Sequence, residues 1–165
     1  SGFWTAMVFF VEGPPYHYTS RGAGMFGLIG AAGAMAAPLA GRIVDRSGGQ
    51  RNVLYSILMM LVAYAILAAF GTNLAAFILG VILLDLGQQF GHVSNQTRIY
   101  GLIPEARSRL NMIYMTCSFS GGAVGSYLCT YFWNVAGWPG VCAFSLTLLT
   151  AALGIWWLFN RQPQK

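Results

Sequence analysis

The stretch from Leu74 to Ile103 constrains the fold of this chain more than any other. It is long and apolar, and its only charged residues are Asp85 and Arg98. A run of 18 or more residues with almost no charge is a candidate membrane span, because about 20 residues of α-helix cross the hydrocarbon core of a bilayer. The stretch therefore predicts a membrane helix in which Asp85 lies close to the middle of the membrane.

One face of this helix is polar. At about 100° per residue, six polar side chains fall within an arc of about 120°: Asp85, Gln88, Gln89, His92, Asn95 and Gln96. A charged residue at mid-membrane costs about 2.5–3.5 kcal/mol and usually faces a bundle interior or an aqueous cavity. The face could be a hydrogen-bonding seam between helices. Two titratable groups among the six favour a substrate or proton path.

The composition agrees with a membrane protein. The chain of 165 residues is 56% hydrophobic and only 8% charged, whereas soluble domains are about 25% charged. Its net charge of +5 comes from basic residues in short connectors between apolar segments. Nucleic-acid binding needs a basic patch on a soluble face, so we expect the lipid bilayer, and no nucleic acid, as a partner.

The motifs of common enzymes are absent from the sequence. Cys117, Cys129 and Cys142 lie in or beside apolar segments and form no CxxC pair or Cys/His cluster, so we expect neither a metal site nor a disulfide framework. The sequence also lacks a phosphate-binding GxxxxGK[ST] loop, an HExxH pair and a GxSxG turn. We therefore expect no enzyme activity, no cofactor and no ATP-driven transport.

The sequence predicts one membrane domain of six helices over residues 1–165. The predicted spans are residues 1–11, 23–40, 53–70, 74–103, 112–135 and 141–159, with a tight turn at Trp138–Gly140. The first is about half the length that a span requires, so it is either an interfacial segment or a truncated helix, and the truncated helix is favoured. Small residues allow close helix packing in two of the spans, and the candidate packing positions are Gly27, Gly30, Gly121, Gly122 and Gly125.

The basic residues predict the orientation. Eight of the nine lysines and arginines lie in alternate connectors or in the C-terminal tail, and the other side holds only Arg21. Because Lys and Arg are enriched in cytoplasmic loops, the turn around Asp45 and the C-terminus are expected in the cytoplasm. We expect a multi-pass protein of the inner (plasma) membrane.

The turn between the second and third spans resembles the signature loop of the major facilitator superfamily. The family pattern is Gly, three residues, Asp, a basic residue, any residue and Gly, followed by two basic residues. Gly41, Asp45, Arg46 and Gly48 match it. Gly49 and Gln50 stand at the two final positions, and a basic residue follows at Arg51, as in C-terminal copies of the loop.

The resemblance covers essentially the whole chain and implies the C-terminal half of such a transporter, helices seven to twelve. The stretches 95–100 and 104–109 also resemble bacterial efflux members of the superfamily. The implied fold is an all-α, six-helix half-bundle whose first helix is truncated and whose partner is a missing N-terminal half of six helices. The helix with Asp85 would be the tenth, beside the central cavity.

The same resemblance gives the cytoplasmic turn a role. Its residues would form a conformational gate whose contacts break and re-form as the two halves rock. The gate residues would be Gly41, Arg42, Asp45, Arg46, Gly48 and Arg51. A solvated anchor that only satisfies the charge asymmetry is the alternative interpretation.

Two hypotheses for function remain. The preferred one is half of a proton-coupled secondary transporter, an antiporter that exports a small organic molecule. Asp85 would bind and release the proton, because poorly solvated surroundings favour the neutral acid. Phe3, Trp4 and Phe9 could stack on the substrate, although packing or lipid contact explains them better. The alternative is a non-transporting assembly or sensor subunit, or an inert truncated product.

Overall fold

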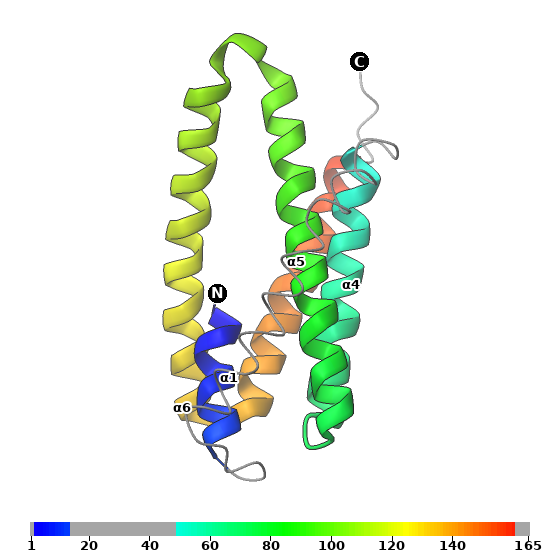
Figure 1. Cartoon of the computed structure of the whole chain (residues 1–165), viewed down its shortest axis with the longest axis vertical. Coiled ribbons are helices and arrows are strands. Elements are labelled where there is room, and N and C mark those ends of the chain that lie inside the picture. The colour runs from blue at the N-terminus through cyan, green and yellow to red at the C-terminus, as the bar shows by residue number, and fades with distance from the viewer. Residues whose placement is uncertain (1, 14–48, 161–165) are drawn as a thin grey trace.

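A computed structural model describes residues 2–13 and 49–160, and every element in these residues is a helix (Figure 1). The helices are α1 (Gly2–Glu12), α4 (Gly49–Phe70), α5 (Leu74–Leu102), the 3₁₀ turn η1 (Pro104–Ala106) and α6 (Arg107–Asn160). Within the described ranges, three helical stretches are long and apolar enough to cross a membrane: Arg51–Phe70, Leu74–Leu102 and Arg107–Phe159. The predicted all-α membrane class is confirmed.

Part of the prediction lies outside the described residues. This part comprises the span 23–40, the packing positions Gly27 and Gly30, and the gate residues Gly41, Arg42, Asp45, Arg46 and Gly48. Arg51 is the one predicted gate residue that the structure describes, and its side chain is exposed in the first turns of α4.

Helix α6 consists of two arms, residues 107–136 and 138–160, that run in opposite directions (Figure 1). Between them Gly137 adopts φ 61° and ψ −149°, a left-handed conformation that glycine tolerates best. The break lies just before the predicted turn at Trp138–Gly140, and Pro139 lies in the first turn of the second arm, where proline is accommodated. The predicted spans 112–135 and 141–159 thus lie on the two arms of one hairpin.

The other turns alternate between the two ends of the bundle (Figure 1). At one end, the side-chain oxygen of Asn73 caps α5 by accepting hydrogen bonds from the backbone N–H groups of Ala75 (3.0 Å) and Ala76 (3.3 Å). At the opposite end, Pro104 opens η1 and Glu105 lies in its first turn. The described arginines belong to the helix ends on the η1 side: Arg51, Arg98, Arg107 and Arg109.

Helices α4 and α5 pack closely through glycines. A Cβ atom on Gly80 would lie 2.7 Å from Cγ of Leu67, and one on Gly91 would lie 2.9 Å from Oγ of Ser56. A Cβ atom on Gly87 would lie 2.9 Å from Cγ of Met60. These distances are shorter than van der Waals contact, so a larger residue at any of the three positions would force the side chains of α4 or the helices themselves to shift. The glycine face lies about 120° around α5 from its polar face.

An aromatic cluster holds α1 against the turns at the Gly137 end. The ring of Phe10 stacks on Trp138 with centroids 4.2 Å apart, and Phe77 lies 5.6 Å from Phe10. Nε1 of Trp138 donates a buried hydrogen bond of 3.0 Å to the backbone oxygen of Leu67. The cluster therefore joins α1, α4, α5 and α6, and it leaves the polar face of α5 free to face a cavity further along the bundle.

Candidate functional site

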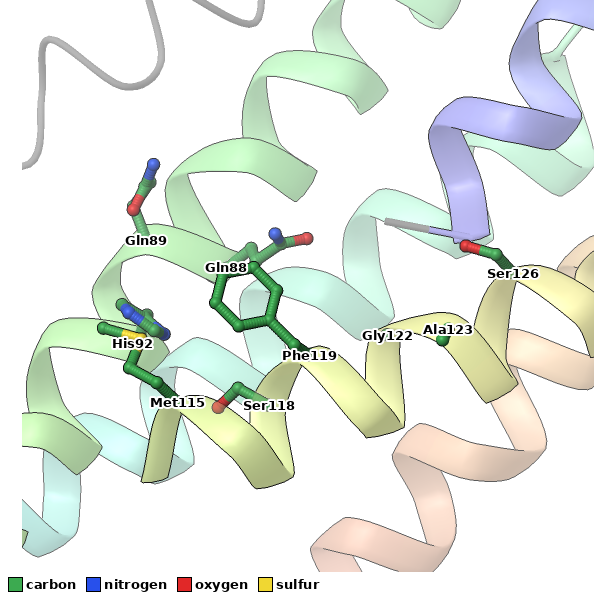
Figure 2. Close-up of a pocket in the computed structure, with 9 residues that line it drawn as sticks. All are labelled: Gln88, Gln89, His92, Met115, Ser118, Phe119, Gly122, Ala123 and Ser126. Carbon is green, nitrogen blue, oxygen red and sulfur yellow. The ribbon is translucent and has the colours of Figure 1, made fainter. Parts of the chain in front are cut away.

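A cavity of about 550 Å³ lies between the polar face of α5 and the first arm of α6. Figure 2 shows the nine residues that line it: Gln88, Gln89, His92, Met115, Ser118, Phe119, Gly122, Ala123 and Ser126. Three come from the predicted path on α5, and six come from α6. The volume lies within the range of about 300–1,000 Å³ that is typical of small-molecule sites.

The chemistry of the cavity wall combines polar and apolar side chains. The amides of Gln88 and Gln89 and the hydroxyl groups of α6 can donate and accept hydrogen bonds. Phe119 adds an aromatic ring to the wall (Figure 2). None of the nine lining residues is Asp, Glu, Lys or Arg. Such a wall suits an organic molecule with hydrogen-bonding groups and an apolar surface.

Tyr114, on the first arm of α6, holds His92 by direct contact. The hydroxyl oxygen of Tyr114 lies 2.9 Å from Nδ1 of His92 and 3.3 Å from the backbone oxygen of the same residue. The two rings are 5.2 Å apart at their centroids. Because Nδ1 contacts the tyrosine, Nε2 remains as the other polar atom of the imidazole ring. Whether Nε2 donates or accepts depends on which ring nitrogen carries the hydrogen.

A second polar cluster joins α5 to α6 nearer η1. Nε2 of Gln96 donates to the hydroxyl group of Tyr100 (2.8 Å), which in turn donates to Oδ1 of Asn111 (2.7 Å). Gln96 also lies 3.4 Å from Oδ1 of Asn111. The cluster closes the α5–α6 interface on the η1 side of the cavity.

Asp85 lies at the other end of the polar face, where Trp4 of α1 contacts it. Its side chain is 7% exposed, and the indole of Trp4, on α1, interacts with its carboxyl group. Oδ2 is buried and has no hydrogen-bond partner among the described residues. A buried polar atom without a partner is costly. Carboxyl groups that are kept inside membrane helices in spite of such a cost are commonly functional.

The predicted path is thus divided into three parts. Asp85 contacts α1, the middle residues Gln88, Gln89 and His92 line the cavity, and Gln96 belongs to the cluster with Tyr100 and Asn111. Asn95 is half-buried and does not line the cavity. The joint role of the six residues as one path stays a prediction.

The remaining predicted residues have varied surroundings. A Cβ atom on Gly121 or Gly125 would meet nothing within 4 Å, and Gly122 lines the cavity; their role in packing other helices stays a prediction. Phe3 is buried in the core, whereas Phe9 is 44% exposed. Phe3 therefore packs against other helices rather than projecting freely.

Sequence reasoning did not assign Trp4 to Asp85 and did not single out Tyr100, Asn111 or Tyr114 as partners of the polar face. The available signal was the pair Asn111 and Tyr114, polar groups that face α5 at the start of an otherwise apolar arm. No group of three or more His, Cys, Asp or Glu side chains among residues 2–13 and 49–160 is arranged to hold a metal ion.

Comparison with known proteins gives consistent matches. The sequence model of a family described as Major Facilitator Superfamily matches residues 1–165. The chain is 39% identical over 160 residues to "Uncharacterized transporter YgaY" of Escherichia coli O157:H7, and equally to YgaY of strain K12. It is 33% identical over 144 residues to "Probable transporter SCO4007" of Streptomyces coelicolor. No solved structure gives a significant match.

The matches cover most of this chain but only part of the relatives. The alignment with YgaY includes 96% of this chain and 41% of YgaY. The alignment with SCO4007 includes 87% of this chain and 33% of that protein. The chain therefore spans about two fifths or less of the length of the curated relatives that it matches.

Proposed function

Because the chain belongs to the Major Facilitator Superfamily, whose members are membrane transporters rather than enzymes, we propose that it is half of a proton-coupled secondary transporter that exports a small organic molecule. The chain is a multi-pass, all-α membrane half-bundle of that superfamily. The proposed location is the inner membrane, with the C-terminus in the cytoplasm.

One observation carries the proposal. The polar face of α5 presents Gln88, Gln89 and His92 to a cavity of about 550 Å³, and the same face places Asp85 in a buried position. A substrate in the cavity can exchange hydrogen bonds with the amides and hydroxyl groups of its wall. Asp85 can carry the proton, since Oδ2 is buried and lacks a partner among the described residues.

The cavity needs a second wall. Such transporters consist of two halves with the substrate site near the middle of the membrane between them. We propose that an N-terminal half of six helices supplies this wall, and the 41% coverage of YgaY supports a longer whole protein. Polar groups of the α5 face would otherwise meet lipid, at several kcal/mol for each unsatisfied group.

The experiment is transport by the full-length protein in liposomes that contain a pH-sensitive dye. Addition of a transported molecule should change the internal pH. Asp85→Asn should abolish transport driven by a pH gradient but leave counterflow exchange of radiolabelled substrate largely intact, because exchange needs no net proton movement. Glu105→Gln, at an exposed carboxyl group in the first turn of η1, is the control. Gradient-driven transport that survives Asp85→Asn unchanged would make Asp85 structural.

The proposed partner half has its own test. The 165 residues alone, reconstituted in liposomes, should give no saturable flux, and co-expression of the N-terminal half should restore it. Saturable flux from the chain alone, lost on Asp85→Asn, would mean that two copies form a complete transporter.

The proposed gate is tested separately. Asp45→Asn should lower the transport rate much more than the substrate affinity, because a contact that differs between two conformations affects their exchange. A changed affinity at an unchanged rate would instead place Asp45 at the substrate site.

A further inference from the structure

A second chamber adjoins the polar cavity. It has a volume of about 260 Å³ and lies among α1, α4, α5 and both arms of α6. Gln88 and Gly122 line both spaces, so the chamber and the polar cavity share a boundary at these two residues. Because the two spaces adjoin, a molecule bound in the polar cavity can extend into the chamber.

The wall of the chamber differs from that of the polar cavity. Phe3, Leu84, Phe144 and Leu149 supply aromatic and aliphatic surface. The polar side chains in the wall besides Gln88 are Tyr64 and Ser145, which are buried and interact with each other. A pair that satisfies itself offers little to a ligand. The space therefore favours an apolar group.

The chamber exists because α6 carries glycine along this side. Gly121, Gly122 and Gly125 line it, and a Cβ atom on Gly121 or Gly125 would meet no atom within 4 Å. These glycines thus leave open space, in contrast to Gly80 and Gly91 of α5, where a Cβ atom would contact another helix below 3.0 Å. A side chain at position 125 would enter this space without displacing the backbone.

We propose that this chamber is a subsite for the apolar end of an elongated amphipathic substrate whose polar, uncharged end binds Gln88, Gln89 and His92. The inference rests on the proposed function of the polar cavity. An apolar cavity of about 150 Å³ is enough to hold benzene, and a water-sized group occupies about 30 Å³. The chamber accordingly accommodates an aromatic ring or a chain of about eight carbon atoms.

The test uses octanamide with a diazirine at the end of its chain as a photoreactive probe. The full-length protein is illuminated with the probe in nanodiscs, and the labelled residues are identified by mass spectrometry. We expect saturable labelling of Phe144 and Leu149, because the amide binds the glutamines and the chain end reaches the chamber. Unmodified octanamide should compete at a concentration about 250-fold below that of butanamide, since it has four more methylenes and each buried methylene raises affinity about fourfold.

Longer alkyl chains also partition more strongly into lipid. A matched pair of glycine substitutions distinguishes binding in the chamber from this partitioning. Gly125→Leu fills the chamber and should abolish both the saturable labelling and the advantage of octanamide. Gly154→Leu, at an exposed glycine of the second arm where a Cβ atom would meet nothing within 4 Å, should leave both unchanged. Monodisperse elution of both variants establishes that they fold.

Two results would overturn the proposal: labelling that is not saturable and lies on exposed residues such as Val124 and Leu158, or saturable labelling that persists in folded Gly125→Leu. The assay requires binding but no transport. Labelling of the chamber without proton flux would therefore contradict the proposed function and support the subsite, whereas flux that depends on Asp85 without chamber labelling would do the reverse.

Discussion

The hydroxyl group of Tyr114 bridges two atoms of His92, its ring Nδ1 at 2.9 Å and its backbone oxygen at 3.3 Å. A hydroxyl group has one hydrogen to donate. If it donates to Nδ1, Nε2 carries the ring hydrogen and is a donor. If it donates to the backbone oxygen, it can accept from Nδ1–H, and Nε2 becomes an acceptor. The hydrogen-bonding role of Nε2 of His92 is thus coupled to the direction in which the hydroxyl group of Tyr114 donates.

Tyr114→Phe should destabilise the protein by about 0.5–1.5 kcal/mol, because it removes the hydrogen bonds to His92. Thermal unfolding in detergent measures this change. Tyr127→Phe, on the same arm but 72% exposed, is the control and should have little effect. Equal stability of the two variants would mean that the contact between Tyr114 and His92 contributes nothing.

Gly91→Ala should destabilise the protein by about 1–3 kcal/mol, because the added Cβ atom would lie 2.9 Å from Oγ of Ser56 in the packed α4–α5 interface. Gly101→Ala, where nothing lies within 4 Å, should be neutral or slightly stabilising, since alanine favours helix. Thermal unfolding of both variants checks the contrast, and a neutral Gly91→Ala would show that the interface can open at little cost.

Trp138→Phe should destabilise the protein by about 1–2 kcal/mol, because it removes the buried hydrogen bond to the backbone oxygen of Leu67 and leaves that oxygen without its indole donor. The measurement is again the unfolding temperature. Trp157→Phe, at a side chain that is 47% exposed, is the matched control. A larger loss from Trp157→Phe would contradict the assignment of Trp138 to the core.

Single cysteines at Thr72 and Ser108 should react with a membrane-impermeant thiol reagent from opposite sides. Both positions are exposed, and their turns lie at opposite ends of the bundle (Figure 1). The basic residues predict that Ser108→Cys is labelled from the cytoplasm and Thr72→Cys from outside. Labelling of both from one side would contradict the topology, and a reversed pattern would invert the orientation.

The sequence was sufficient to predict helices and faces but not the contacts between helices. Charge depletion and the period of the helix predicted α5 and its polar face, because both are local properties. The contact of Asp85 with Trp4 and that of His92 with Tyr114 depend on how distant segments pack. No local pattern specifies such pairs.

The glycines also show that local sequence does not specify the contacts between helices. Gly121 and Gly125 have the spacing of a packing motif, yet open space surrounds their Cβ positions. Gly80, Gly87 and Gly91 contact α4 directly, but within a long apolar helix they were not distinguished from the surrounding residues. Composition indicates where helices can approach closely, and the partner decides where they do.

The close contact of α4 with α5 also determines where this bundle can bend. Helices that meet at glycine, with atoms of one against the backbone of the other, resist sliding because each small shift causes steric overlap. By contrast, α5 and the first arm of α6 meet through side-chain hydrogen bonds such as those of Gln96 and His92, which water can replace. We expect α4 and α5 to move as one rigid body, and we expect relative motion at the interface between α5 and the first arm of α6.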